Sequence, residues 1–354
     1  MQARVPCSRM FLAAALSTAA CGAPPAAPRA AAFGTESSSP SQEPSAASPP
    51  PSLEGSSSDS KQPLPGSDTS LSDDASTGAA SAEFACGPYT CRRYATSEEA
   101  FLAVISAENP RVLGVGEAHA RATSRVPSAT RRFTEELLPT IADRTHSLVV
   151  ELLAPNAACQ KETNAVREQQ EPVTREQAST NQNEFVSLGE RARSLGIVPY
   201  LLRPSCADLD AITRAGENDV WVMLETIARL TTAQVERLLA SSNEAPSRRL
   251  VIAYGGAVHN DLEPRPARET WSYGPALANH LEESNAGPYV ELDLIVPELA
   301  QDNDAWRAQP WYGHYDAAAA QGHAQTLRLG PRRWVLFFPS SPPALEGTSP
   351  PTTR

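Results

Sequence analysis

The sequence predicts an α/β fold in which helices flank a mainly parallel sheet, in a single globular domain after a disordered tether. Short apolar runs of strand length alternate with segments whose apolar residues recur at helical spacing, which is typical of βαβ units. Residues 22–83 are rich in Ser, Pro and Ala and hold few large apolar side chains. Such a stretch cannot bury enough surface to offset its conformational entropy. Residues 84–339 are long enough for one core, and the tail at 340–354 resembles the tether.

The expected elements follow from apolar runs and their boundaries. The run at 112–115 ends at Gly116, which suits a strand end, and the helix expected before Gly196 ends at a C-cap signal. Strands are expected at 112–115, 148–152, 197–202, 250–254 and 289–296, with a late pair at 326–329 and 334–338. Helices are expected at 97–108, 130–144, 185–195, 220–239 and 273–283. The polar stretch at 160–183 is expected to be an insertion or lid rather than core.

The N-terminus predicts export. Arg4 and Arg9 precede an apolar run at 10–16 and then small residues up to Cys21, so residues 1–21 read as a signal peptide. Residues 18–21 resemble a bacterial lipobox, although Thr18 stands where Leu is usual. We therefore expect acyl chains on Cys21 to anchor the protein in the lipid bilayer of a bacterial envelope, at the outer membrane or the cell surface. The alternative is a plain secretory signal that is cleaved among the following alanines.

Charge and hydropathy restrict the partners. The net charge of -11 and the lack of a Lys/Arg stripe argue against a nucleic-acid partner. No apolar run after the signal is long enough to span a bilayer. Gly114 and Gly116 lack the third glycine of a dinucleotide-binding loop, so we do not expect the protein to bind a dinucleotide at this strand end.

Four cysteines remain once Cys7 leaves with the signal and Cys21 carries lipid. An even number in an oxidising compartment suggests two disulfides, and four cysteines allow three pairings. We favour one bond that closes a small loop around Gly87 and another that joins two loops after predicted strands. These bonds are Cys86–Cys91 and Cys159–Cys206. Free thiols or a metal site are the alternative, but the Cys-x4-Cys spacing is not that of a zinc pair.

Two carboxylates and two imidazoles fall at the ends of predicted strands. Glu117 and His119 follow the run at 112–115, Glu151 closes the run at 148–152, and His259 follows the glycines after 250–254. In open α/β sheets ligands bind at the carboxyl edge. An acid inside an apolar run such as that around Glu151 is costly to bury unless it is paired or ligated. We therefore expect Glu117, His119, Glu151 and His259 to share one site.

This donor set is compatible with two chemistries. Two imidazoles with carboxylates suit Mn, Zn, Co or Fe, and such a metal can lower the pKa of a bound water. The same four residues can also act without metal, one Glu–His pair taking a proton from water while the other orients or acts as an acid. Taken singly, each has a plainer interpretation: loop residues for Glu117 and His119, a salt bridge for Glu151, turn chemistry for His259. Trp311 and His314 either line a pocket or anchor a packed loop.

Residues 112–119 (VLGVGEAH), 149–151 (VVE) and 256–259 (GAVH) resemble the superfamily of erythromycin esterases, TraB/TIKI proteins and ChaN-like lipoproteins. The ChaN-like branch is the most similar, because it shares the Gly-Glu-x-His spacing of Gly116, Glu117 and His119 and is also a lipoprotein family. The resemblance covers residues 111–261. It implies an α/β fold and a site made of Glu117, His119, Glu151 and His259.

The branches imply different functions. The TIKI branch resembles a metal-dependent protease, the esterase branch a Glu/His hydrolase, and the ChaN branch a haem-binding protein. The long tether, the cysteines and the region after Pro264 depart from the ChaN pattern. We expect hydrolysis of an ester or peptide bond in a small-molecule or peptide substrate. The alternative is a lipoprotein without turnover that binds haem or iron through His or Tyr.

Overall fold

The structure is a computed structural model, and it describes residues 82–175, 177–241, 249–315 and 320–340. The signal, most of the tether, the tail after Ser340 and therefore Cys21 lie outside the described residues. The strands are β1 (Ala82–Cys86), β2 (Tyr89–Tyr94), β3 (Val112–Glu117), β4 (Thr145–Leu153), β5 (Val198–Leu202), β6 (Leu250–Gly256), β7 (Tyr289–Ile295), β8 (Ala324–Gly330) and β9 (Arg333–Phe337). The helices are α1 (Ser97–Glu108), α2 (Ala129–Arg132), α3 (Gln160–Thr174), α4 (Asn181–Ser194), α5 (Cys206–Arg214), α6 (Asp219–Ala240), α7 (Gly274–Glu283) and α8 (Asp304–Arg307).

The predicted α/β fold with a mainly parallel sheet is confirmed. One nine-stranded sheet has the order β1-β2-β8-β9-β7-β3-β6-β4-β5. The six strands from β9 to β5 are parallel, whereas β8, β2 and β1 continue the sheet antiparallel. β3 lies between β6 and β7, so Glu117, which ends β3, is next to Gly256 of β6 and Leu294 of β7. The carboxyl ends of these three strands thus meet around Glu117.

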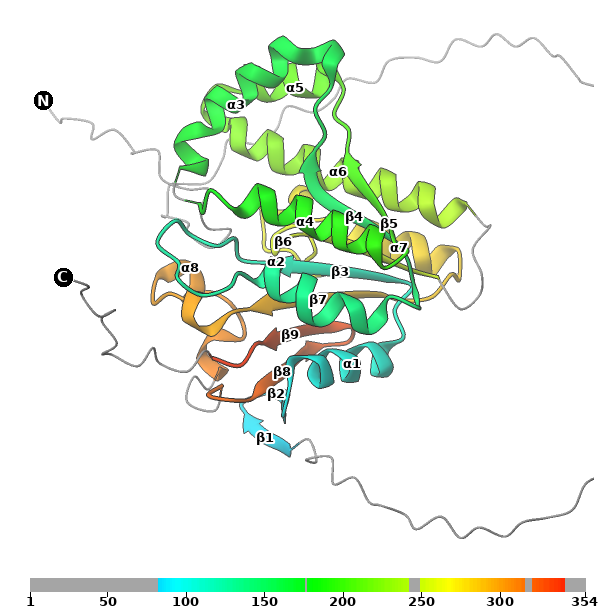
Figure 1. The fold of residues 1–354 in the computed structure, drawn as a ribbon, viewed down its shortest axis with the longest axis vertical. Helices are drawn as coiled ribbons and strands as arrows, with labels where there is room; N and C mark the ends of the chain where they lie inside the picture. Colours follow the sequence, from blue (N-terminus) through cyan, green and yellow to red (C-terminus); the bar gives the residue numbers. More distant parts are fainter. Residues whose placement is uncertain (1–81, 176, 242–248, 316–319, 341–354) are drawn as a thin grey trace, which may run out of the picture. The chain divides into compact units, whose positions relative to one another are not determined.

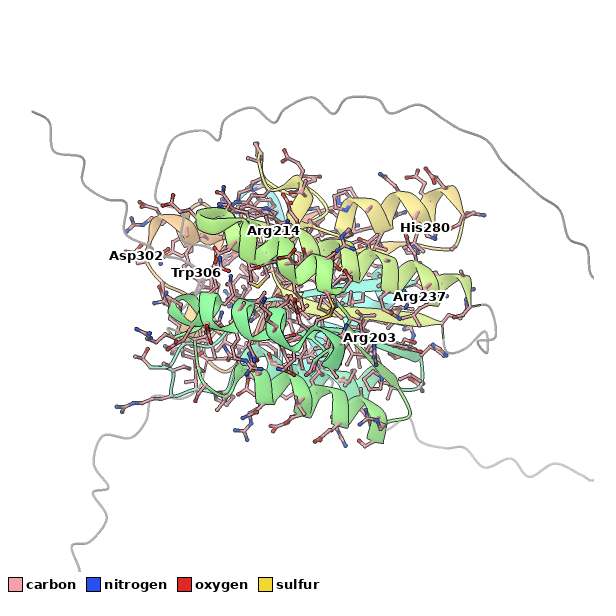
Figure 2. All side chains as sticks on the ribbon, turned by 90° about the horizontal axis from the view of Figure 1, so that it is seen from above. Arg203, Arg214, Arg237, His280, Asp302 and Trp306 are labelled. Atoms are coloured by element: carbon pink, nitrogen blue, oxygen red, sulfur yellow. A yellow bond between two sulfur atoms is a disulfide. The ribbon has the colours of Figure 1, made fainter. Side chains whose placement is uncertain are left out.

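Helices cover both faces of the parallel strands (Figure 1). α1, α2 and α4 pack on one face around Phe101, Phe133 and Tyr254. α6 and α7 pack on the other face, around Val149 and Val251. Charged side chains such as Arg214 and Arg237 project outward from the helices (Figure 2). Because both faces are covered, the parallel strands read as near-continuous apolar runs rather than as alternating patterns.

Helix α1 shows why its bounds could be read from the sequence. The Thr96 side chain caps its first turn by accepting from the backbone N–H of Glu99 at 3.1 Å, and Glu98 and Glu99 suit its positive end. Asn109 adopts a left-handed conformation at its C-cap, with φ of 43°. The prediction of a helix at 97–108 is therefore confirmed.

The prediction of one continuous helix at 130–144 is wrong. α2 ends at Arg132 and continues as a π-turn (Phe133–Leu137) and a 3-10 turn (Leu138–Ile141). Pro139 lacks an N–H and disfavours helical backbone at the residue before it, so the regular ladder cannot pass this point. Phe133, Leu137 and Ile141 are still fully buried, which is why their spacing resembled one helix.

The polar stretch at 160–183 is more regular than expected. Residues 160–174 form α3, which packs against α5 with Val166, Leu209 and Ile212 in a small core of their own. The strands β1 and β2 and the helix α5 have no counterpart in the sequence prediction. β1 begins at Ala82, two residues before the expected start of the domain.

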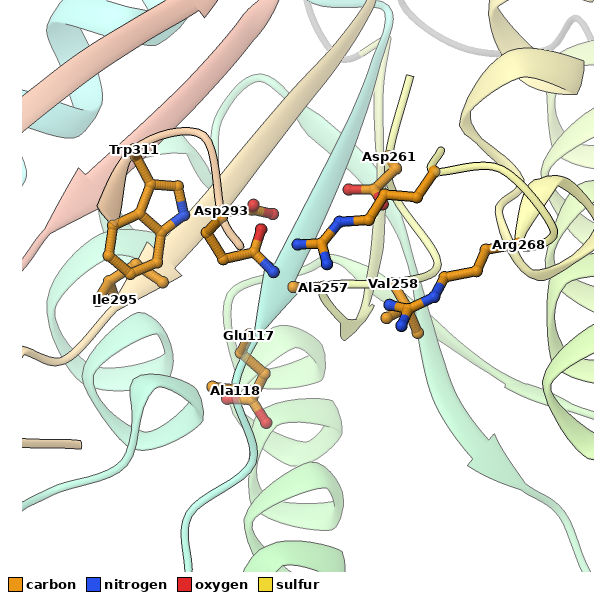
Figure 3. A pocket seen from close by; sticks show the side chains of 11 residues that line it. Glu117, Ala118, Ala257, Val258, Asp261, Arg268, Asp293, Ile295 and Trp311 are labelled. Carbon is orange, nitrogen blue, oxygen red and sulfur yellow. The ribbon is translucent and has the colours of Figure 1, made fainter. Parts of the chain in front are cut away.

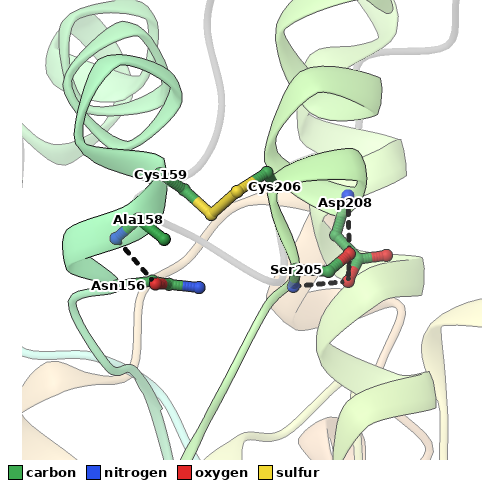
Figure 4. The surroundings of a disulfide bond; sticks show 6 residues. All are labelled: Asn156, Ala158, Cys159, Ser205, Cys206 and Asp208. Atoms are coloured by element: carbon green, nitrogen blue, oxygen red, sulfur yellow. Dashed lines mark hydrogen bonds between the residues drawn. A yellow bond between two sulfur atoms is a disulfide. The ribbon is translucent and has the colours of Figure 1, made fainter.

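Both predicted disulfides are present. Cys86 and Cys91 join β1 to β2 across their turn, and Cys159 and Cys206 join the start of α3 to the start of α5 (Figure 4). The Ser205 side chain caps α5 and is itself held by Asp208, in a capping box. Cys159 is fully buried, so the second bond lies inside the α3–α5 core.

Removing the Cys159–Cys206 bond should destabilise the protein more than removing Cys86–Cys91. The Cys159–Cys206 bond spans 47 residues and the Cys86–Cys91 bond spans 5. A longer closed loop restricts the unfolded chain more strongly. We expect the double variant Cys159→Ala/Cys206→Ala to lose about 2–4 kcal/mol of unfolding free energy. Urea unfolding monitored by circular dichroism measures this loss. An equal or larger loss in Cys86→Ala/Cys91→Ala would contradict it.

No helix in the described ranges is both long and apolar enough to cross a membrane.

Candidate functional site

The four residues expected at strand ends lie together at the carboxyl edge of the sheet. Glu117 is the last residue of β3 rather than the first residue after it, and His119 follows two positions later. Glu151 lies within β4, which runs on to Leu153, and His259 is the third residue after the end of β6. They form two Glu–His pairs.

The first pair is Glu117 and His119. The Nδ1 of His119 lies 2.9 Å from Oε1 of Glu117. The other carboxylate oxygen of Glu117 accepts from the Thr130 hydroxyl at 2.6 Å and from the Tyr254 hydroxyl at 3.0 Å. Glu117 is 2% exposed, whereas the His119 side chain is 21% exposed. Glu117 is thus a fixed acceptor that leaves Nε2 of His119 free.

The second pair is Glu151 and His259. The backbone N–H of Gly256 donates to Oε2 of Glu151 at 2.6 Å, and Nε2 of His259 lies 3.5 Å from Oε1. The Nδ1 of His259 lies 2.6 Å from the carbonyl oxygen of Trp271, which can only accept, so Nδ1 carries a proton. The side chains of His259 and Glu151 are 1% and 15% exposed. In this pair the buried imidazole holds the more accessible carboxylate.

Gly256 separates the two pairs. A methyl group built on its Cα would lie 3.6 Å from Nε2 of His119 and 3.6 Å from Oε2 of Glu151. Both accessible groups therefore face the same small space. At the neighbouring Gly255, such a methyl group would lie 2.2 Å from Oε2 of Glu151, so only glycine fits there.

Burial and the paired charges shift the pKa values in the site. Burial lowers the pKa of His119, but the hydrogen bond and charge of Glu117, together with Glu151, raise it above 6.5. Burial also opposes ionisation of Glu151, yet His259, His119 and the Gly256 N–H lower its pKa to about 2. Burial similarly lowers the pKa of His259, and Glu151 and the Trp271 carbonyl outweigh that effect and raise it. Glu151 is therefore an anion at any neutral pH, and the two imidazoles, His119 and His259, are the groups whose charge can change.

Sequence reasoning missed Thr130 and Tyr254, which hold Glu117. Tyr254 packs against Phe133, with ring centroids 4.9 Å apart, and Phe185 lies edge-on to both Tyr254 and His119. Burial and the charge of Glu117 raise the pKa of Tyr254 well above 10, so its hydroxyl stays a donor. The position of Tyr254 at the end of an apolar run was the available signal.

The four residues do not match a preformed metal site. Each imidazole has one nitrogen fixed by a protein acceptor, as metal-binding histidines usually do. In the described parts of the chain, however, no three of the four bring ligand atoms within 4.8 Å of one another. Glu117 and His119 lie 2.9 Å apart and Glu151 and His259 lie 3.5 Å apart, but in the described residues neither pair gains a third ligand from the other pair within that limit. The arrangement leaves a gap between two acid–base pairs.

A second group of acids lies beside this site and was not predicted. Asp261, Glu291 and Asp293, here called the acidic triad, place ligand atoms within 4.8 Å of one another. Asp261 and Asp293 line a pocket that also touches Glu117, Arg265 and Trp311 (Figure 3). Glu291 and Asp293 alternate within the apolar strand β7, so the burial-cost argument used for Glu151 would have found them. Trp311, which is 2% exposed, both lines this pocket and packs against Phe337.

The acidic triad resists ionisation. Burial raises the pKa of Asp261 to about 6, against the opposing effect of Arg333, Arg265 and Arg268. Burial and Asp261 raise the pKa of Glu291 to about 7, although Arg333 counteracts them. Burial, Glu291 and Asp261 raise the pKa of Asp293 well above its usual value. Without a cation, these carboxyls retain protons toward neutral pH.

Asp261→Asn should stabilise the cation-free protein at pH 8 and have little effect near pH 4. A carboxyl with a raised folded-state pKa binds more protons in the native state, so stability falls as pH rises from about 4 to about 6. The variant removes that loss, which is at most about 3 kcal/mol for a shift of this size. Thermal unfolding in a chelator at both pH values measures the difference. A variant that is less stable than the wild type at pH 8 would contradict the claim that burial raises the pKa of Asp261.

No protein-family model matches this chain, and no curated protein or solved structure matches it either. The resemblance to the erythromycin esterase, TraB/TIKI and ChaN-like superfamily therefore stays a prediction that depends on the motif residues alone.

Proposed function

We propose that the protein is a hydrolase whose two Glu–His pairs activate a water molecule for attack on an ester or peptide bond. The observation that carries this proposal is the pairing itself: each accessible group is held by a buried partner. His119 is held by Glu117, and Glu151 is held by His259. Nε2 of His119 and Oε2 of Glu151 face one space beside Gly256. A water in that space would have an acceptor on each side.

In this proposal His119 is the general base. Its Nε2 faces the space beside Gly256, its neighbour Glu117 stabilises the imidazolium that forms, and the hydrogen bond and charge of Glu117 raise its pKa above its usual value. Glu151, with a pKa of about 2, is too weak a base for that role. It instead accepts a hydrogen bond from the water and stabilises the cation on His119. The proton moves from water to Nε2 while the water oxygen bonds to the carbonyl carbon, and the imidazolium then protonates the leaving group.

Glu117 and His259 are positioning residues. Glu117 fixes the tautomer of His119, as the carboxylate of a Ser-His-Asp triad does for its imidazole. His259 holds Glu151 through its Nε2, and its Nδ1 is fixed by Trp271. A divalent metal, one of Mn, Zn, Co or Fe, would require the two pairs to move closer together, and no step of this proposal needs one.

His119→Gln tests the proposal against a matched control, His280→Gln. His280 is a half-exposed histidine on α7, 3.9 Å from Glu236. Assays of the purified full-length protein on a panel of esters and peptides, in a chelator, should find a substrate that His280→Gln hydrolyses at the wild-type rate. His119→Gln should lose about 10²–10⁴-fold in kcat. Equal rates for both variants would refute the assignment.

We also propose that this hydrolase is exported and lipid-anchored. Two disulfides are typical of an oxidising compartment, and the N-terminal residues read as a signal that ends at a lipobox-like Cys21.

Palmitate labelling in a bacterial host should depend on Cys21. We expect Cys21→Ser to lose the label and to leave the membrane fraction, because the acyl chains supply the membrane affinity. Cys7→Ser is the matched control and should keep both. Labelling that persists in Cys21→Ser would exclude the lipid anchor and leave the plain secretory signal.

A further inference from the structure

We infer that the acidic triad of Asp261, Glu291 and Asp293 is a binding site for a hard divalent cation such as Ca²⁺. The site is separate from the two Glu–His pairs, and it was not the location that the sequence suggested for a metal. The inference is independent of the proposed hydrolysis.

The donor type selects the class of ion. The three ligand atoms lie within 4.8 Å of one another, which is within the reach of one Ca²⁺ with Ca–O bonds of about 2.3–2.6 Å. All three donors are carboxylate oxygens, which suit Ca²⁺, Mg²⁺ or Mn²⁺ rather than the softer metals.

A buried amide oxygen supplies a second observation. Asn260 is fully buried, and its Nδ2 donates to Oδ1 of Asp293 at 3.0 Å and to the carbonyl of Gly114 at 3.3 Å. Among the described residues, its Oδ1 has no hydrogen-bond partner. This oxygen and Oδ1 of Asp293 lie 2.4 and 2.6 Å from one point, the place of a Cβ on Gly116. An orphaned, fully buried oxygen next to a carboxylate of the triad is a group that a bound cation would satisfy.

The neighbouring arginines Arg333, Arg265 and Arg268 oppose the charge of Asp261 from a distance, and Arg333 also pairs with Glu291. Arg333 is shared between Glu291, at 3.3 Å, and Glu263. In the described residues, no Arg or Lys nitrogen comes within 4.0 Å of the Asp261 or Asp293 carboxylate, and NH2 of Arg265 is buried without a partner. A divalent ion between the carboxylates would remove their mutual repulsion.

The cation would also fix the segment that carries His259. Asn260 and Asp261 follow that histidine directly, and Ser272 ties the segment down by donating to the carbonyls of His259 and Asp261. Asp293 belongs to β7, which is paired with β3. Binding would therefore link this segment to the sheet next to Glu117.

Terbium luminescence gives a direct test, because Tb³⁺ takes the oxygen ligands of Ca²⁺ and emits when a nearby tryptophan is excited. Trp311 lines the same pocket as Asp261 and Asp293. With the chelator-stripped full-length protein, we expect tryptophan-sensitised emission at one Tb³⁺ per chain, displaced by Ca²⁺. Trp311→Phe should lower the emission while Ca²⁺ binding by calorimetry persists.

Matched variants locate the ion. Asp293→Asn and Asp261→Asn should each weaken Ca²⁺ binding at least tenfold and, since they relieve repulsion, should not lower the melting temperature of the cation-free protein. Asp302→Asn, at a carboxylate that is 74% exposed, and Glu151→Gln should bind as the wild type does. No Ca²⁺ binding by the wild type, or binding that survives in Asp293→Asn, would overturn the inference. Loss of binding in Glu151→Gln would place the ion at the Glu–His pairs and equally refute it.

Discussion

Glu117→Gln should lower kcat for the hydrolysed substrate by about 10²–10⁴-fold while leaving the fold intact. The amide keeps the size of the side chain, and its oxygen can still accept from Thr130 and Tyr254. Its NH₂ group would then donate to Nδ1 of His119, which forces the proton of the imidazole onto Nε2. An imidazole protonated at Nε2 cannot take a proton from water. Steady-state kinetics with circular dichroism of the folded variant measure this loss.

Glu135→Gln serves as the matched control, because Glu135 is an exposed carboxylate in the same region that pairs with Arg131. We expect its turnover to equal that of the wild type. A folded Glu117→Gln protein with wild-type kcat would show that His119 does not depend on Glu117, and the assigned roles would then be wrong.

Gly256→Ala should abolish most turnover without unfolding the protein. The added methyl group would make only ordinary contacts, at 3.6 Å from Glu151 and from His119. Gly256 is not among the glycines with left-handed backbone, so alanine is compatible with its conformation. The methyl group would, however, occupy the space proposed for water. We expect a stability change within about 1 kcal/mol and a loss of kcat of at least a hundredfold.

The adjacent Gly255→Ala separates blocked space from a distorted site. Its methyl group would lie 2.2 Å from Oε2 and 2.9 Å from Cβ of Glu151, so the carboxylate must move. We expect this variant to lose stability as well as turnover. If Gly256→Ala retains wild-type turnover, the water does not lie between His119 and Glu151.

The sequence predicted the architecture and the four residues because both depend on short-range patterns. Parallel strands covered on both faces are apolar throughout, and their carboxyl ends fall at one edge, which is why the strand pattern was enough to group Glu117, Glu151 and His259. The helix at 130–144 could not be predicted correctly, since apolar spacing does not distinguish a regular helix from π and 3-10 turns around Pro139.

The geometry within the site was beyond the sequence. Whether the four residues converge on an ion or form two pairs depends on a few ångströms between β3, β4 and the segment after β6. Thr130 and Tyr254, which hold Glu117, come from different elements, so no local motif links them to it. The acidic triad joins Asp261 to two residues of β7, and this long-range contact becomes visible only in the folded chain.

The pH dependence of kcat/KM in the presence of a chelator tests the central claim most directly. The account predicts that kcat/KM rises with pH as His119, whose pKa Glu117 raises above its usual value, loses its proton. In Glu117→Gln the rise of the residual kcat/KM should move to lower pH. The imidazolium of His119 loses its stabilising carboxylate in this variant, so the pKa of His119 falls. A profile that Glu117→Gln does not shift would contradict this account. So would a purified protein that hydrolyses no ester or peptide and binds haem stoichiometrically.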